Sequence, residues 1–232
     1  MCGTEEAQTI EPQVNILCSA PGFTVPYPDD VDAKLTESNT IFNWGGVTIA
    51  KISPTIAVKF GSHVRLSEAK NIMFVEQNID TPYFHQLRQL RHENYIGSAD
   101  FGPVTDPFLE TYFNKGPFDS EESFNNTIIE AYQLKAPKRH IKSFLVGMLS
   151  QKRYQIVFTH GDLRPQNIIV NHGNISGIVD WEFSGWYPEF WAFSKALYVW
   201  KWQNDWTNYL IQFLEPYYSE YAVHSFLTEV LW

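Results

Sequence analysis

The sequence has little cysteine, no surplus of basic side chains and no long apolar run. Its 232 residues include two cysteines, Cys2 and Cys18, whose spacing matches neither a metal site nor a disulfide framework. A formal net charge of −9 argues against general affinity for nucleic acid or anionic membranes, which both attract surplus Lys and Arg. The sequence also shows no secretory signal pattern at its start, and no stretch with the roughly 18 apolar residues of a membrane span. We therefore expect a cytoplasmic protein that binds neither nucleic acid nor membrane.

Apolar and aromatic side chains, by contrast, are abundant. Hydrophobic residues make up 44% of the chain and aromatic residues 16%, which is enough to bury a sizeable core in one large domain or two small lobes. The residue patterns divide the chain into three parts. They are a loosely ordered leader with several prolines (1–28), a small strand-rich lobe (29–82) and a larger lobe (83–232).

The small lobe shows three short β-favouring runs, separated by Gly45-Gly46 and Ser53-Pro54. The runs lie at residues 41–44, 47–52 and 55–60. This pattern predicts a small antiparallel meander. Residues 66–77 mix apolar and polar side chains in a way that predicts a helix closing the lobe.

In the larger lobe, helices are expected before strands. Helical patterns cover residues 83–91, 121–134 and 141–149, with a long proline-containing loop at 102–120. Strand-like runs follow at 154–158, 167–170 and 175–179, and a strong turn at 171–174 predicts a hairpin between the last two. From Trp181 onward the aromatic-rich sequence predicts two or three amphipathic helices, whose tryptophans favour core packing over a substrate pocket.

The most informative stretch is His160-Gly161-Asp162-Leu163-Arg164-Pro165-Gln166-Asn167, followed by Ile178-Val179-Asp180-Trp181-Glu182. A hairpin turning at residues 173 and 174 would place Asn167 opposite Asp180, and their oxygens would suit Mg²⁺. Asp162, on the connecting loop, could face the same space and accept a proton from a substrate hydroxyl. Arg164 could meet a phosphate. Taken singly, these are ordinary turn, cap and buried polar residues, but their joint spacing favours phosphoryl transfer.

This block resembles the catalytic loop and metal-binding strand of the aminoglycoside phosphotransferase and choline kinase family, relatives of the protein kinases. The family pattern is His-Gly-Asp followed by Asn, and then an Asp after an apolar strand. The positions that match it in order and spacing are His160, Gly161, Asp162, Asn167 and Asp180. The continuation from Trp181 to Trp191 is similar to the fungal members.

The resemblance implies an α+β, protein-kinase-like fold of two lobes, with a small, reduced β-rich N-lobe and a larger, mainly α-helical C-lobe that carries the catalytic-loop hairpin. It implies that Asp162 is the catalytic base or orients the substrate, and that Asn167 and Asp180 hold Mg²⁺ on the phosphates of ATP. It also implies that His160 supports the loop. An imidazole is not needed for this chemistry.

In the small lobe the resemblance is weaker. Lys59, within Ala57-Val58-Lys59-Phe60-Gly61, resembles the lysine that contacts the α- and β-phosphates, with a solvated strand lysine as the alternative. Glu68 resembles the glutamate that pairs with this lysine, and Glu76 on the same predicted helix competes for that role. The resemblance thus implies nucleotide contacts from Lys59, Glu68 and, in the catalytic loop, Arg164.

Three features depart from the family pattern. Gly45-Gly46 is too short to indicate a phosphate-cradling loop. After Thr81-Pro82 the family has two further strands and an apolar hinge that holds adenine, whereas residues 83–91 already resemble the helix beyond the hinge. Ala192 also stands after Trp191, where fungal relatives commonly carry an acidic residue. The missing hinge points either to an incomplete gene product or to a diverged protein that no longer binds ATP.

The sequence therefore favours an ATP- and Mg²⁺-dependent phosphotransferase acting on a small hydroxyl-bearing molecule. The alternative is a catalytically inactive kinase-like binding module, or a truncated gene product, without the adenine-binding hinge. A metal-dependent phosphohydrolase using Asp162 and Asp180 is a weaker third hypothesis, because the histidine-rich ligand set of such enzymes is absent.

Overall fold

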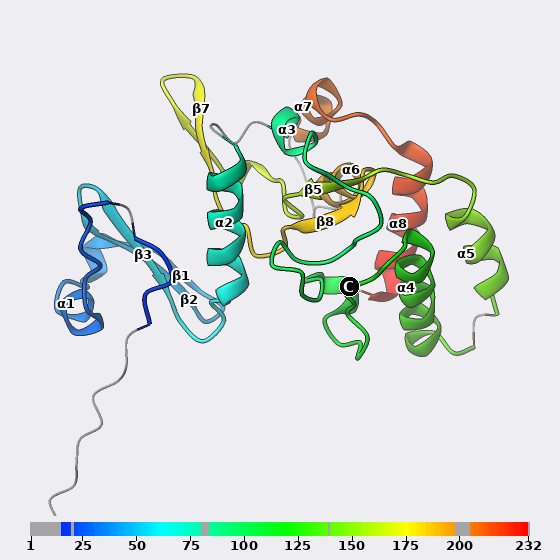
Figure 1. Ribbon diagram of the computed structural model, residues 1–232, viewed down its shortest axis with the longest axis horizontal. Coiled ribbons are helices and arrows are strands. Elements are labelled where there is room, and N and C mark those ends of the chain that lie inside the picture. The colour runs from blue at the N-terminus through cyan, green and yellow to red at the C-terminus, as the bar shows by residue number, and fades with distance from the viewer. Residues whose placement is uncertain (1–14, 20, 80–83, 139, 198–204, 232) are drawn as a thin grey trace, which may run out of the picture. The chain divides into compact units, whose positions relative to one another are not determined.

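The computed structural model describes residues 15–19, 21–79, 84–138, 140–197 and 205–231 (Figure 1). The chain divides into two compact units, Met1–Val64 and Arg65–Trp232. The helix at 66–77, which the sequence assigns to the small lobe, belongs to the second unit. The predicted lobe boundary at residue 82, and most of the predicted leader, lie outside the described residues.

The first unit contains the predicted antiparallel meander. Its elements are α1 (Pro28–Asp32), the 3₁₀ turn η1 (Glu37–Asn39), β1 (Thr40–Trp44), β2 (Val47–Ser53) and β3 (Ile56–Phe60). The strand order β1-β2-β3 confirms the prediction. Gly45 and Gly46, with φ of 62° and 77°, form the two-residue turn between β1 and β2, a conformation that glycine adopts at little cost. β1 is an edge strand that exposes Ile41, Phe42 and Trp44.

The second unit combines helices with two small sheets, so the chain as a whole is an α+β protein. Its helices are α2 (Leu66–Asn78), α3 (Phe84–Leu87), α4 (Glu121–Lys135), α5 (Lys142–Leu149), α6 (Trp191–Leu197), α7 (Trp206–Phe213) and α8 (Tyr218–Leu231). Its strands are β4 (Arg91–His92), β5 (Ile156–Thr159), β6 (Ile168–Asn171), β7 (Asn174–Ile178) and β8 (Gly185–Pro188), with 3₁₀ turns η2 (Pro107–Leu109) and η3 (Pro165–Asn167).

Most of the predicted elements of this unit are confirmed, with two corrections. Among the described residues, the helix expected over 83–91 is shortened to α3, and the chain then pairs as β4. β8 was not expected, since the sequence after Trp181 predicts helices alone. β8 exists because it pairs with β5 along its whole length, from Ile156↔Pro188 to Thr159↔Gly185.

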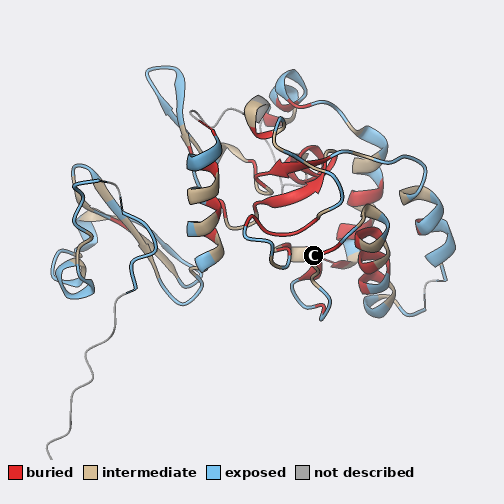
Figure 2. Ribbon diagram, in the orientation of Figure 1, coloured by how far each residue is buried: buried red, intermediate tan, exposed pale blue. Residues whose placement is uncertain are grey.

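The core of the second unit surrounds the sheet β4-β5-β8. Every residue of β5 and β8 is buried. Figure 1 shows these strands between α2 on one side and α4 and α8 on the other, and Figure 2 shows them in the buried colour throughout. Trp186 and Trp191 lie in this core, and the Trp191 ring stacks on Tyr187 with centroids 5.6 Å apart, so core packing is confirmed for both tryptophans.

Candidate active site

The predicted catalytic loop, residues 160–167, connects β5 to the predicted hairpin, which is present as β6 and β7. His172 and Gly173 form its two-residue turn, with φ of 49° and 79°. Positive φ at both central positions matches the right-handed twist of the strands. The loop therefore runs directly from a buried strand into a hairpin, and both ends of the loop are fixed by sheet pairing.

The register of this hairpin differs from the expected one. A turn at residues 173 and 174 would place Asn167 opposite Asp180, but the turn lies one residue earlier. An irregularity follows, because Val170 pairs with Ile175 whereas Ile169 pairs with Gly177, which leaves one extra residue in β7. As a result Val179 N donates to Asn167 O at 2.9 Å, and Asp180 lies one residue beyond the pair.

The structure nevertheless brings Asp162, Arg164, Asn167 and Asp180 together. Asn167 Nδ2 donates to Asp162 O at 2.8 Å and to Asp162 Oδ2 at 2.9 Å, which leaves Oδ1 as the acceptor atom of its amide. Arg164 Nε lies 3.0 Å from Asp162 Oδ2, and Arg164 Nη2 lies 3.7 Å from Asp180 Oδ2. Two carboxylates, an amide and a guanidinium thus form one charged cluster.

Two backbone conformations bring the loop and the hairpin into this arrangement. Gly161 has φ of 85°, and a Cβ at this position would lie 2.2 Å from Phe183 O. Only glycine fits there, because both the conformation and the space exclude a side chain. Asp180 has φ of 67°, a left-handed conformation that costs a non-glycine residue on the order of 1 kcal/mol and recurs at functional sites.

His160 supports this cluster from a fully buried position. Its Nδ1 accepts from Asp162 N at 3.3 Å, and its Nε2 donates to Val179 O at 3.0 Å. The neutral imidazole of His160 therefore connects Asp162 to Val179, the residue before Asp180. Burial lowers the pKa of His160 from 6.5 to about 4, which keeps the imidazole uncharged.

This lowered pKa predicts an acid-sensitive fold. Between pH 6.5 and 4 the unfolded chain binds a proton at His160 that the folded chain does not, so the free energy of unfolding falls as pH falls. The loss should reach about 2 kcal/mol at pH 5. Urea unfolding at pH 7 and pH 5 measures it. His160→Gln should show a smaller drop, whereas His172→Asn, on the exposed turn, should behave like the wild type; equal drops in all three proteins would contradict the assignment.

Asp162 has the environment of a proton acceptor. Burial raises the pKa of its carboxyl above the ordinary 3.8, and this effect is opposed by the Arg164 charge and the Asn167 hydrogen bond. A carboxylate with a raised pKa is a stronger base than a solvated one. Its position at the centre of the cluster therefore suits general base chemistry.

The comparison with protein families agrees with this geometry. The model of the phosphotransferase enzyme family matches residues 117–227, which include the whole catalytic loop and hairpin. This part of the chain belongs to the phosphotransferase enzyme family. The resemblance drawn from the catalytic-loop motif is thereby confirmed. A search of the curated proteins found no match.

The oxygens of Asn167 and Asp180 are of the kind that binds Mg²⁺. Among the described residues no group of three or more His, Cys, Asp or Glu side chains could hold a metal ion by itself. Mg²⁺ does not require such a group, since it keeps several waters and is bound through one or two carboxylates plus substrate phosphates. The oxygens of Asn167 and Asp180 fit that pattern.

Lys59 and Glu68 belong to different compact units, in β3 and at the start of α2. Their predicted pairing therefore stays a prediction. Glu68 is buried on α2, whereas its competitor Glu76 is exposed on the same helix. This difference favours Glu68 as the residue with an internal role.

The sequence did not reveal two buried polar contacts beside the site. Asn71, in the middle of α2, donates to Trp181 O and Ser184 O in the segment after Asp180. Lys195 Nζ lies 2.9 Å from Asp106 Oδ1, and its charge acts on Asp162 by lowering the carboxyl pKa. A polar residue within the buried face of a helix was the available local signal for both Asn71 and Lys195.

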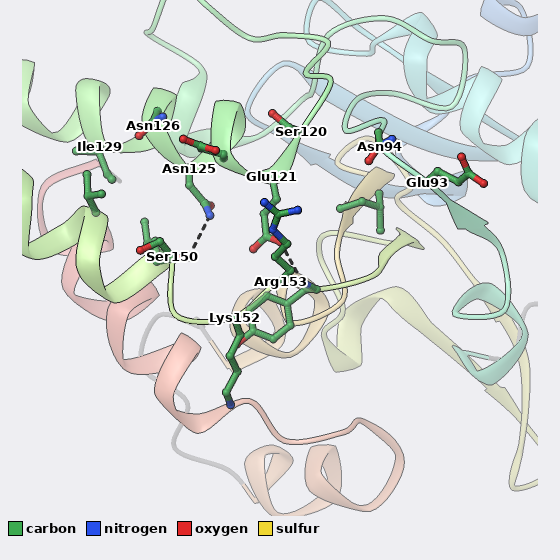
Figure 3. A pocket seen from close by; sticks show the side chains of 15 residues that line it. Glu93, Asn94, Ser120, Glu121, Asn125, Asn126, Ile129, Ser150, Lys152 and Arg153 are labelled. Carbon is green, nitrogen blue, oxygen red and sulfur yellow. Dashed lines mark hydrogen bonds between the residues drawn. The ribbon is translucent and has the colours of Figure 1, made fainter.

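A cavity of about 380 Å³ lies apart from this cluster, between the first turns of α4, the end of α5 and residues 150–156 (Figure 3). None of the predicted site residues lines it. Figure 3 shows Glu121 and Arg153 near its centre, where Glu121 Oε2 accepts from Tyr154 N at 3.0 Å.

In the described part of the chain, no helix is both long and apolar enough to cross a membrane.

Proposed function

We propose that the chain is an ATP- and Mg²⁺-dependent phosphotransferase that moves the γ-phosphate of ATP to a hydroxyl group of a small molecule. The observation that carries this proposal is the convergence of Asp162, Asn167 and Asp180 on the catalytic loop and hairpin. Membership of the phosphotransferase family supports the class of reaction.

In this proposal each residue of the cluster has one task. Bound Mg²⁺ would neutralise the phosphate charge, and the oxygens of Asn167 and Asp180 would hold it. Asp162 would orient the acceptor hydroxyl and take its proton at a carboxylate oxygen. Arg164 is partly exposed and forms ion pairs with Asp162 and Asp180, so its guanidinium could reach an incoming phosphate. His160 would keep the cluster in place without taking part in the chemistry.

In the same proposal the chain has the two lobes of a protein-kinase-like fold, a reduced β-rich N-lobe and a larger, mainly α-helical C-lobe. β3 would supply Lys59 to the nucleotide phosphates, and α2 would supply Glu68 as the partner of Lys59. The acceptor is a small hydroxyl-bearing molecule. The acidic composition suits a cationic acceptor such as an aminoglycoside or a choline-like amine.

A second candidate is an inactive kinase-like module that binds a partner. The observation that favours it is β1, an edge strand of the first unit whose side chains Ile41, Phe42 and Trp44 are exposed. Thr81, Pro82 and Tyr83, where the sequence lacks the adenine-binding hinge, lie outside the described residues.

Calorimetric titration with MgATP separates the two candidates. The wild type should bind MgATP. Asp180→Ala should abolish the binding, because the variant lacks the carboxylate oxygen that would coordinate Mg²⁺. Asp180→Asn is the matched control for the backbone, since asparagine tolerates the φ of 67° that strains alanine. Weak binding by both variants would assign the loss to the carboxylate. A folded wild-type protein that binds no MgATP would contradict the proposal that the chain is an ATP-dependent phosphotransferase.

A further inference from the structure

Asn71 connects helix α2 to the segment that follows Asp180. The residue is 1% exposed, and its Nδ2 lies 2.7 Å from Trp181 O and 3.3 Å from Ser184 O. An amide nitrogen carries two hydrogens, so both carbonyls can be bonded at once. The two bonds span residues 110 and 113 positions apart in the sequence.

The helix itself gains little from an asparagine at this position. Asn71 lies in the interior of α2, where asparagine is less favourable than alanine by roughly 0.7 kcal/mol. An unbonded buried amide would cost about 1–3 kcal/mol more. The contribution of Asn71 therefore lies in the carbonyls that it holds.

Those carbonyls belong to the segment that sets the conformation of Asp180. On the N-terminal side, Val179 is fixed by Asn167 O and by His160 Nε2. On the C-terminal side, Trp181 O accepts from Asn71, and Ser184 N closes the turn onto Trp181 O at 3.1 Å. Asp180 lies between these two attachments with its strained φ of 67°, and such a conformation persists only where the surroundings hold it.

We infer that Asn71 is a positioning residue, which directs the Asp180 carboxylate to the metal by holding the backbone after it. This inference rests on the proposed function, because it concerns the same metal site. It adds a role for α2: Glu68, Asn71 and Val75 form its buried face, so the helix that carries Glu68 also determines where Asp180 lies. A shift of α2 would therefore change the affinity for metal.

The test measures Mn²⁺ affinity of the full chain by electron paramagnetic resonance, in a series with decreasing numbers of donors. Asn71→Ser keeps one donor and Asn71→Ala keeps none. Loss of a residue that orients a metal ligand costs about 10-fold or more in affinity, so the alanine variant should bind Mn²⁺ at least about 10-fold more weakly, with the serine variant between it and the wild type. If the alanine variant does not fold, the serine variant still gives the expected weakening.

Asn125→Ala is the matched control, since Asn125 is also a buried helical asparagine whose Nδ2 donates to a backbone carbonyl, that of Leu149 at 3.4 Å. It should lower the melting temperature and leave Mn²⁺ affinity unchanged. Asn71 variants that bind Mn²⁺ like the wild type, while Asp180→Asn binds it weakly, would overturn the inference and leave the proposed function intact. Equal binding by the wild type and Asp180→Asn would instead overturn the proposed function.

Discussion

Asp162→Asn should lower the turnover number at least about 100-fold, because an amide cannot take the proton of the acceptor hydroxyl. The substitution preserves the shape of the side chain, and the oxygen of the new amide can still accept from Asn167 Nδ2. The fold and the affinity for MgATP should therefore stay close to those of the wild type. ADP formation from MgATP, with choline or an aminoglycoside as acceptor, measures the effect.

The pH profile provides an independent check on Asp162. The base must be ionised, so activity is present above the pKa of Asp162 in the folded protein and is lost as pH falls through it. Since burial raises this pKa above 3.8, the acid limb should begin at a higher pH than for a solvated aspartate, and it should vanish in Asp162→Asn. Asp119→Asn, at an exposed aspartate, should keep the wild-type rate and profile. Unchanged turnover in Asp162→Asn would remove the residue from the mechanism.

Lys195→Met should destabilise the fold by about 3–5 kcal/mol, because it leaves the Asp106 charge buried without its cation. The two side chains are only 4% and 3% exposed, and their atoms lie 2.9 Å apart. Asp106 also accepts from Trp191 Nε1 and from Phe108 N, while Lys195 Nζ lies 4.2 Å from the centre of the Phe108 ring. Asp106→Asn should be costly for the converse reason. Urea unfolding gives both free energies.

The double variant Asp106→Asn/Lys195→Met should recover much of the loss, since it removes both charges together. A surface pair in the same unit serves as the control. Arg65 Nη2 and Glu110 Oε1 lie 2.8 Å apart, but the side chains are 44% and 56% exposed. Glu110→Gln should cost no more than about 1 kcal/mol. Single variants of the buried pair that cost as little as Glu110→Gln would contradict the prediction.

The sequence revealed those features whose cause is local. The turn sequence at residues 171–174 predicts the hairpin, although the turn lies at His172 and Gly173 and not at the predicted residues 173 and 174. Gly45-Gly46 predicts the first turn of the meander in the same way. Asp162, Asn167 and Asp180 could be brought together on paper because a hairpin relates residues by simple counting. Chain segments that pair with near neighbours were therefore predicted well.

Features that depend on distant residues were missed. β8 is a strand because β5 lies beside it, and its Gly-Trp-Tyr-Pro sequence alone does not favour one. The turn lies one residue earlier than predicted and β7 holds one extra residue, so the partner of Asn167 is Val179 instead of Asp180. The hydrogen bond from Lys195 to Asp106 joins residues 89 positions apart, which a local pattern cannot reveal.

The close packing of Gly161 against Phe183 O limits how the catalytic loop can be transplanted or recombined. Phe183 O occupies the space where a Cβ would be, so the loop that carries Asp162 and the segment that follows Asp180 fit together as one interlocking part. A graft that moved residues 160–167 into another scaffold without residues 178–184 would lose the backbone of Phe183, against which Gly161 packs. Recombination that exchanged only one of the two segments between relatives would disrupt the same contact. We therefore expect the two segments to be inherited together.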